Sequence, residues 1–254
     1  MRTDASSRPV TIVTGASRGI GAAVAERLAA DGHDLVLTYQ DRTADAEDVV
    51  RACEASGARV LLLRVDLADL EQAASLMPAA IAEFGTVTGL VNNAGITGRI
   101  GGFLDGSIEE SEIVFRTNVL APIVLTRAAI AHMATDRGGV GGSIVNISSG
   151  AATTGAPNTY IPYSMSKAAL NALTTGTSKE FGPVGVRVKT VSPGTTRTEI
   201  HATAGRPNAP DERAPSIPMR RPGEVHEIAG AVAYLFSPDA SYTSGADIRV
   251  AGGN

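Results

Sequence analysis

The sequence predicts an α/β protein built on a doubly wound parallel sheet of about seven strands, with helices on both faces. Short, apolar, β-branched segments alternate with segments of helical period from residue 10 to residue 250. The strand segments are apolar throughout instead of alternating with polar residues, so both faces of the sheet should be covered. A glycine-rich turn joins the first strand to the first helix, as in nucleotide-binding sheets.

The first half of the chain repeats a strand, a turn and a helix. Val10-Thr11-Ile12-Val13-Thr14 is β-branched and is closed by Gly15, and glycines at 32, 57 and 85 end the helical segments that follow. The expected strands are 10–14, 35–39, 59–65 and 89–92, and the expected helices are 20–30, 44–56 and 70–84.

The second half continues the alternation with longer helices. A long helix is expected at 111–135, and Pro122 within it has no N–H to give to the carbonyl of Asn118. The helix should therefore bend near Asn118 and leave that carbonyl free to hold a water. The strands 143–147, 187–191 and 247–250 and the helices 163–181 and 224–236 complete the pattern.

Length and charge limit the classes of function. A chain of 254 residues with 43% hydrophobic content suits one domain, 1–254, because no linker, repeat or low-complexity segment divides it. The net charge of −4 argues against a nucleic-acid partner, which a basic face would attract. No apolar run approaches the roughly 20 residues of a membrane span, so a membrane partner is not expected.

Cysteine and histidine usage point to a reducing compartment without a structural metal. The single cysteine, Cys53, has no intramolecular partner, and no apolar leader precedes the first strand, so we expect a cytoplasmic protein. The histidines lack metal-ligand spacing, and no metal is expected. They are His33, His132, His201 and His226.

The segment Tyr163-Ser164-Met165-Ser166-Lys167 can supply a proton donor. Residues four apart on a helix share one face, so Tyr163 and Lys167 should stand beside each other. An ammonium beside a phenol favours the phenolate and should lower the pKa of Tyr163. Such a tyrosine can exchange protons with a substrate oxygen. A solvated helix pair has the same spacing, so this pattern depends on the rest of the chain.

The first turn, Thr14-Gly15-Ala16-Ser17-Arg18-Gly19-Ile20-Gly21, has the composition of a phosphate-binding loop. Backbone amides and the dipole at a helix N-terminus favour a pyrophosphate, and glycines let the backbone come close. The spacing is GxxxGxG, not the commoner GxGxxG.

With these motifs in order along nearly its full length, the chain resembles the short-chain dehydrogenase/reductase family of the single-domain, Rossmann-like type. The further motifs are Asp66, Asn92-Asn93-Ala94-Gly95, Asn118, Ser149, Pro193-Gly194 with Thr198, and Gly252-Gly253. The resemblance implies a nicotinamide cofactor. It implies that this cofactor contacts Gly15, Ser17, Arg18, Gly19, Ile20, Gly21, Tyr39, Arg42, Asp66, Leu67, Asn93, Ala94, Gly95, Tyr163, Lys167, Pro193, Gly194 and Thr198.

The resemblance also implies a catalytic set of Asn118, Ser149, Tyr163 and Lys167. Tyr163 exchanges the proton, Lys167 lowers its pKa and binds the ribose, Ser149 holds the substrate oxygen, and Asn118 anchors a water relay. The family usually separates this serine from the tyrosine by thirteen residues, whereas here the separation is fourteen. Ser148 is therefore an alternative to Ser149, and Tyr160 is a second nearby phenol that we expect to line the pocket.

Charge favours NADP(H) over NAD(H). An acid at the end of the second strand would bind the ribose hydroxyls and repel a 2′-phosphate, but Tyr39 or Gln40 stands there. Arg18 and Arg42 can clamp that phosphate between two guanidinium groups. Asp41, just beyond the strand, is the argument for NAD(H).

Within the family, the chain is similar to glucose 1-dehydrogenase-like and 3-oxoacyl-carrier-protein reductase-like members. This implies hydride transfer to or from a small-molecule carbonyl or alcohol, and a homotetramer. Four prolines and mixed charges at about 197–218 suggest a mobile lid over the substrate. Two other readings stay open: a non-catalytic nucleotide-binding regulator, and a serine hydrolase with the GxSxG sequence Gly15 to Gly19, which lies too early in the chain.

Overall fold

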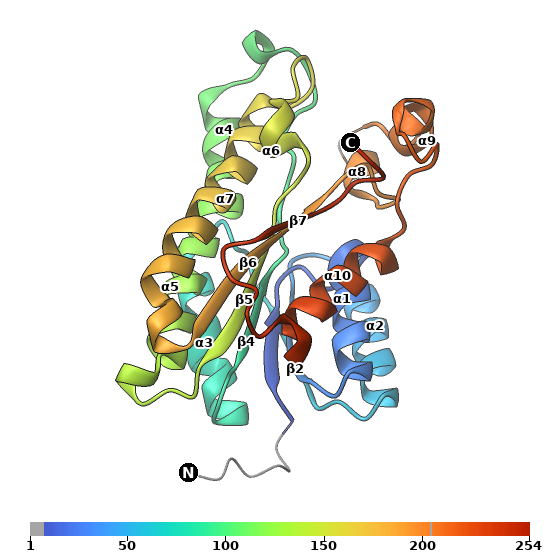
Figure 1. Ribbon diagram of the computed structural model, residues 1–254. Coiled ribbons are helices and arrows are strands. Elements are labelled where there is room, and N and C mark those ends of the chain that lie inside the picture. The colour runs from blue at the N-terminus through green and yellow to red at the C-terminus, as the bar shows by residue number, and fades with distance from the viewer. Residues whose placement is uncertain (1–7, 204) are drawn as a thin grey trace.

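The computed structural model describes residues 8–203 and 205–254, and a seven-stranded, all-parallel sheet lies at its centre (Figure 1). The strands occur in the order β3-β2-β1-β4-β5-β6-β7. The doubly wound sheet predicted from the sequence is thus confirmed. The strands are β1 (Val10–Val13), β2 (Asp34–Tyr39), β3 (Val60–Arg64), β4 (Gly89–Asn92), β5 (Gly142–Ile147), β6 (Val186–Pro193) and β7 (Asp247–Val250).

Two layers of helices cover the sheet (Figure 1). One layer holds α1 (Gly19–Ala30), α2 (Thr43–Ala55) and α10 (Val225–Phe236). The opposite layer holds α3 (Leu70–Phe84), α5 (Ala121–Met133) and α7 (Ile161–Phe181). Each of these helices lies within a few residues of its predicted range, apart from α5, which is discussed below.

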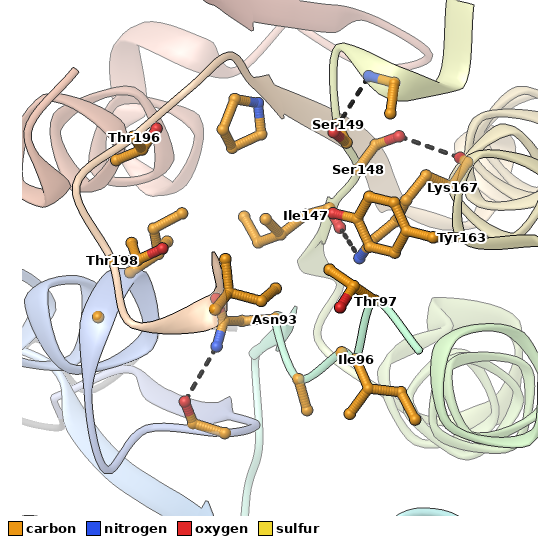
Figure 2. A pocket seen from close by; sticks show the side chains of 18 of the residues that line it. Asn93, Ile96, Thr97, Ile147, Ser148, Ser149, Tyr163, Lys167, Thr196 and Thr198 are labelled. Carbon is orange, nitrogen blue, oxygen red and sulfur yellow. Dashed lines mark hydrogen bonds between the residues drawn. The ribbon is translucent and has the colours of Figure 1, made fainter. Parts of the chain in front are cut away.

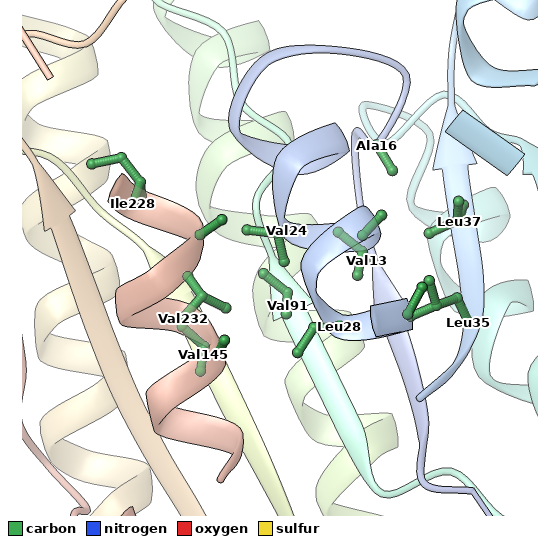
Figure 3. Packing of buried hydrophobic residues seen from close by; sticks show 14 of the residues in the cluster. Val13, Ala16, Val24, Leu28, Leu35, Leu37, Val91, Val145, Ile228 and Val232 are labelled. Atoms are coloured by element: carbon green, nitrogen blue, oxygen red, sulfur yellow. The ribbon is translucent and has the colours of Figure 1, made fainter. Parts of the chain in front are cut away.

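Neighbouring residues on one strand pack into the two cores on opposite faces of the sheet. On β1, Ile12 packs with the α3 and α5 layer, whereas Val13 packs with the α1 and α10 layer, and both are fully buried. On β4, Leu90 and Val91 divide in the same way. Figure 3 shows the α1 and α10 core, where side chains from both helices meet those of four central strands. Burial of both faces explains why these strands are apolar throughout.

The strand order reverses between β1 and β4. Chain connections leave in opposite directions on the two sides of this point, so the loops at the carboxyl ends of β1 and β4 separate and leave a crevice. The glycine-rich turn after β1 and the Asn93-Ala94-Gly95 segment after β4 lie at this crevice. The fold thus gathers the predicted motifs at one edge of the sheet.

The long helix predicted at 111–135 differs in the structure. It begins earlier, as α4 (Ile108–Phe115), passes through a π-helical turn (Arg116–Leu120), and continues as α5 to Met133. Within the turn, the Ala121 N–H donates to the Arg116 carbonyl, five residues back. The π-turn lies where Pro122 was expected to bend the helix, because proline cannot complete the α-helical bond to Asn118.

Several short elements surround the carboxyl edge of the sheet. They are α6 (Ala151–Thr154), α8 (Ile200–Thr203) and α9 (Ala209–Arg213), with 3₁₀ turns at Phe103–Asp105, Thr135–Arg137, Gly182–Val184, Ala214–Ser216 and Pro238–Ala240. In the described chain, one helix, Ile108–Met133, has the length and apolar composition to cross a membrane. Charged residues such as Glu112 and Arg127 interrupt it, and it packs on α3 and α7.

Candidate active site

A cavity of about 940 Å³ opens at the carboxyl ends of the strands. The glycine-rich turn and the loop after β4 line one part of it, and the loop after β5 and the start of α7 line another. In Figure 2, Ser149, Tyr163 and Lys167 lie on one side of the cavity, opposite Thr196 and Thr198. The cavity brings together motifs that are far apart in sequence, from Gly15 to Thr198.

Hydrogen bonds fix the glycine-rich turn to its neighbours. The Gly15 N–H donates to Thr38 Oγ1 at 3.2 Å, and Asn93 Nδ2 donates to the carbonyls of Thr14 and Gly15 at 2.8 and 3.1 Å. A Cβ on Gly21 would lie 2.2 Å from the Gly15 carbonyl oxygen, so only glycine fits there. Asn93 therefore positions the turn as well as lining the cavity.

The N-terminus of α1 is suited to a pyrophosphate. No side chain caps this helix and no acid lies in its first turn, while the residues from Ser17 to Gly21 line the cavity. The N–H groups of its first turn have no partner within the helix and carry the positive end of the dipole. The residues at this helix N-terminus are therefore suited to the pyrophosphate of a dinucleotide cofactor.

Tyr163 and Lys167 lie together at the far end of the cavity, both in the first turns of α7. Tyr163 is 8% exposed and Lys167 is 3% exposed. Lys167 Nζ donates to the Ile147 carbonyl at 2.7 Å and lies 5.7 Å from the centre of the Tyr163 ring. The helix spacing predicted from the sequence therefore does place the ammonium beside the phenol.

The expected lowering of the Tyr163 pKa is not found. Burial raises the pKa of Tyr163 to about 12, the Ser149 hydroxyl acts in the opposite direction, and Tyr160 raises it further. Burial also lowers the pKa of Lys167 to about 8, because desolvation disfavours the ammonium. Burial, and not the neighbouring ammonium, sets the direction of the Tyr163 pKa shift. At neutral pH Tyr163 is therefore a protonated phenol.

The two candidate serines have different surroundings. The Ser148 hydroxyl is buried and donates to the Lys167 carbonyl at 3.0 Å, which ties β5 to α7. Ser149 is half-buried, accepts the Ala151 N–H at 3.1 Å, and is the serine that acts on the Tyr163 phenol. Both line the cavity, but only Ser149 keeps its hydroxyl proton available.

Asn118 is fully buried behind the cavity and does not line it. Its Oδ1 accepts the Ile96 N–H at 2.9 Å, and its Nδ2 donates to the Ile96 carbonyl at 2.8 Å and to Ser166 Oγ at 3.0 Å. A Cβ on Gly95 would lie 3.2 Å from both Asn118 Oδ1 and Lys167 Nζ. Asn118 thus holds the loop after β4 against the helix that carries Tyr163.

Asp66 does not line the cavity either. Its Oδ1 accepts the Ala68 N–H at 2.9 Å, an ordinary turn contact, so its contact with the cofactor stays a prediction. All the other residues predicted to contact the cofactor line the cavity.

Sequence reasoning missed several lining residues. Thr38 could have been predicted, because it lies near the carboxyl end of β2. Arg213 lies in the lid and Arg249 in β7, and no sequence motif marks either residue. Arg213 Nη1 lies 3.4 Å from the Tyr160 hydroxyl, and the Tyr160 ring meets the Tyr163 ring edge to face, 5.0 Å between centres. Tyr160 therefore lines the cavity beside Tyr163, as expected.

The arginine pair predicted for a phosphate is also in place, with a protein carboxylate between its members. Arg18 Nη1 and Arg42 Nη2 each lie 2.9 Å from Glu199 Oε2. Asp41 lines the cavity close by.

The chain is similar to known oxidoreductases along nearly its full length. Residues 15–254 match the family model described as enoyl-(acyl carrier protein) reductase. The chain is 38% identical over 244 residues to the uncharacterised oxidoreductase YgfF of Escherichia coli K12, covering 96% of this chain and 99% of that protein. It is 31% identical over 242 residues to glucose 1-dehydrogenase 2 of Bacillus subtilis 168, covering 95% and 93%.

Among solved structures, a short-chain dehydrogenase from Burkholderia cenocepacia J2315 in complex with NADP superposes with a TM-score of 0.87. The two chains are 34% identical, and the match covers 96% of this chain and 97% of the other.

Proposed function

Since the chain belongs to the short-chain dehydrogenase/reductase family, we propose that it is an NADP(H)-dependent oxidoreductase with Tyr163 as its general acid and base. It is an enzyme of the NAD(P)-dependent class that acts on CH–OH or C=O groups of small molecules. The observation that carries the proposal is the buried Tyr163 phenol beside Ser149 and Lys167, at the far end of a cavity that begins at the α1 N-terminus.

The chemistry requires a hydride and a proton, and a bound nicotinamide supplies or accepts the hydride. The Tyr163 phenol holds the proton at neutral pH, because burial raises its pKa to about 12. In the reductive direction it gives this proton to the oxygen that becomes the alcohol. In the oxidative direction the Tyr163 oxygen must accept the proton of the substrate alcohol, which requires the phenolate form.

The remaining residues orient and hold these groups. The Ser149 hydroxyl donates to the substrate oxygen and stabilises the charge that develops on it. The Lys167 ammonium, which lies beside the Tyr163 ring, binds the ribose when the cofactor is present. Asn118 acts as the anchor of a water relay to Lys167, because it holds the Ile96 loop beside Nζ.

The cofactor preference rests on the arginine pair. Arg18 and Arg42 reach a common point 2.9 Å from each guanidinium, and a 2′-phosphate placed there would receive both. The NADP bound in the Burkholderia cenocepacia relative supports the same choice. Asp41 at the cavity edge favours NAD(H), so the preference needs a direct test.

Three further features belong to the same proposal. The segment 197–218, in which residue 204 lies outside the described residues, carries α8 and α9 beside the cavity and acts as the substrate lid. The family resemblance favours a homotetramer, and the lone Cys53 with its buried thiol suits the cytoplasm. A non-catalytic regulator of the same fold is disfavoured, because it would not need the complete set of Ser149, Tyr163 and Lys167.

A carbonyl panel tests the proposal. Ketones, aldehydes, sugars and acyl thioesters are each mixed with the protein and with NADPH or NADH, and the loss of absorbance at 340 nm is followed. We expect NADPH oxidation with at least one class, and a higher kcat/KM with NADPH than with NADH. Oxidation with NADH alone would overturn the cofactor assignment, and binding of both cofactors with no turnover on any class would favour the regulator.

A further inference from the structure

One carboxylate oxygen bridges two arginines that line the cavity beside the glycine-rich turn. Glu199 Oε2 lies 2.9 Å from Arg18 Nη1 and 2.9 Å from Arg42 Nη2. Arg42 is held from the other side by Asp45, at 3.2 Å from its Nη1. An anion therefore already occupies the point where the two guanidinium groups converge.

The three residues come from separate parts of the fold. Arg18 lies in the glycine-rich turn, Arg42 follows β2, and Glu199 follows β6 at the start of the lid. The lid also touches the turn itself, because a Cβ on Gly19 would lie 3.6 Å from Thr198 Cγ2. The start of the lid therefore lies against the glycine-rich turn, and the ion pairs of Glu199 connect the two.

A phosphate and this carboxylate compete for the same donors. Guanidinium groups bind carboxylate and phosphate oxygens in the same way, and phosphate carries more charge and more acceptors. The side chains of Arg18, Arg42 and Glu199 are 36%, 46% and 54% exposed. Water screens such pairs, so the carboxylate is displaceable.

We propose that Glu199 is a specificity-determining residue that occupies the 2′-phosphate site until the phosphate of NADP(H) displaces it. The inference rests on the proposed function, which supplies the cofactor. The contacts of Glu199 are then exchanged for those of the phosphate, so its carboxylate lowers the affinity for NADP(H) but not for NAD(H). The displacement also releases the first residues of the lid when NADP(H) binds.

Binding of cofactor fragments tests this without turnover. Isothermal titration compares 2′,5′-ADP, which carries the 2′-phosphate, with 5′-AMP, which lacks only that group. Glu199→Gln should bind 2′,5′-ADP roughly three- to tenfold more tightly than the wild type, because two exposed ion pairs are individually weak. Its affinity for 5′-AMP should stay unchanged. Glu199→Ala should behave likewise, which guards against a glutamine that still bonds to the arginines.

Matched variants separate the competition from a general change of charge. Glu212→Gln removes an acid from the same lid, where its partner is Arg206 at 2.7 Å, and should leave both affinities unchanged. In an Arg42→Ala background the gain from Glu199→Gln should shrink, because one of the two competing contacts is gone.

Different outcomes reject different parts of the account. If both Glu199 variants bind 2′,5′-ADP no more tightly than the wild type, or if Glu212→Gln gives the same gain, the competition is rejected. Such a result leaves the oxidoreductase proposal standing as long as the wild type oxidises NADPH. Failure of the wild type to bind NADPH or NADH would instead reject the proposed function.

Discussion

Replacing Lys167 by methionine should stabilise the protein at neutral pH and remove its activity. The side chain is 3% exposed, and burial lowers the pKa of its ammonium from 10.5 to about 8. The folded state therefore holds this proton less tightly than the unfolded chain. Below about pH 8 both states are protonated and the full cost of burying the charge is present, and the cost declines as the pH rises from 8 to 10.5.

The size of the effect follows from these values. The difference between the two pKa values corresponds to a cost of about 3 kcal/mol at pH 7 and about 2 kcal/mol at pH 9. Methionine has a similar length but loses the hydrogen bond from the ammonium to the Ile147 carbonyl, which is worth about 1.5–3 kcal/mol because the donor is charged. The net gain at pH 7 is then at most about 1.5 kcal/mol, or an increase in Tm of at most about 3–6 °C for a chain of this size.

Thermal unfolding followed by circular dichroism from pH 6 to pH 9.5 measures this gain. Lys179→Met is the control, because Lys179 is an exposed lysine on the same helix and should show no comparable shift. A lower Tm for Lys167→Met at pH 7 would refute the reasoning, and so would a gain that grows as the pH rises. A gain in stability together with lost turnover would mean that the lysine is retained for its chemistry.

Three other perturbations probe the cavity, the core and the long helix. Gly21→Ala should abolish NADPH binding, because its Cβ would lie 2.2 Å from the Gly15 carbonyl oxygen. Gly230→Ala is the control and should leave binding intact, because a Cβ there would have nothing within 4 Å. Retained NADPH affinity in Gly21→Ala would contradict this packing. Cys53 should resist iodoacetamide at pH 8 until the protein unfolds, because burial raises the pKa of its thiol to about 12, and rapid alkylation of the folded protein would show that the site is open. Pro122→Ala restores an N–H that can donate to the Asn118 carbonyl, and it should slow turnover, most visibly at low pH. Turnover equal to that of the wild type at all pH values would argue against the water relay at Asn118.

The sheet could be predicted from the sequence because its signals are local. Each strand is a short apolar run that ends at a glycine or a polar turn, and burial on both faces leaves no ambiguity about a parallel sheet. The long helix was placed less well, since a π-turn depends on how the backbone accommodates Pro122 and not on the pattern of apolar residues. The helix begins at Ile108, where Ser107 and Glu110 form a capping box. The prediction used only the period of the apolar residues and did not consider this capping signal.

Parts of the candidate site could be predicted from the sequence where a motif marks them. The glycine-rich turn, Tyr163 and Lys167 were found in this way, and the structure brings them to one cavity. The direction of the Tyr163 pKa shift was not predictable, because it depends on how far burial strips water from the phenol. Glu199 was missed for a different reason: its partners lie 181 and 157 positions away in sequence, and only the folded lid brings them together.

The central claim is that Tyr163, and not its neighbour Tyr160, moves the proton. Tyr163→Phe and Tyr160→Phe are compared with the wild type by fluorescence titration of NADPH and by steady-state turnover of the best carbonyl from the panel. Tyr163→Phe keeps the ring and removes only the titrating hydroxyl, so it should bind NADPH like the wild type and lose turnover by roughly a hundredfold or more. Tyr160→Phe should keep substantial turnover. Wild-type turnover in Tyr163→Phe, or a loss confined to Tyr160→Phe, would contradict the account.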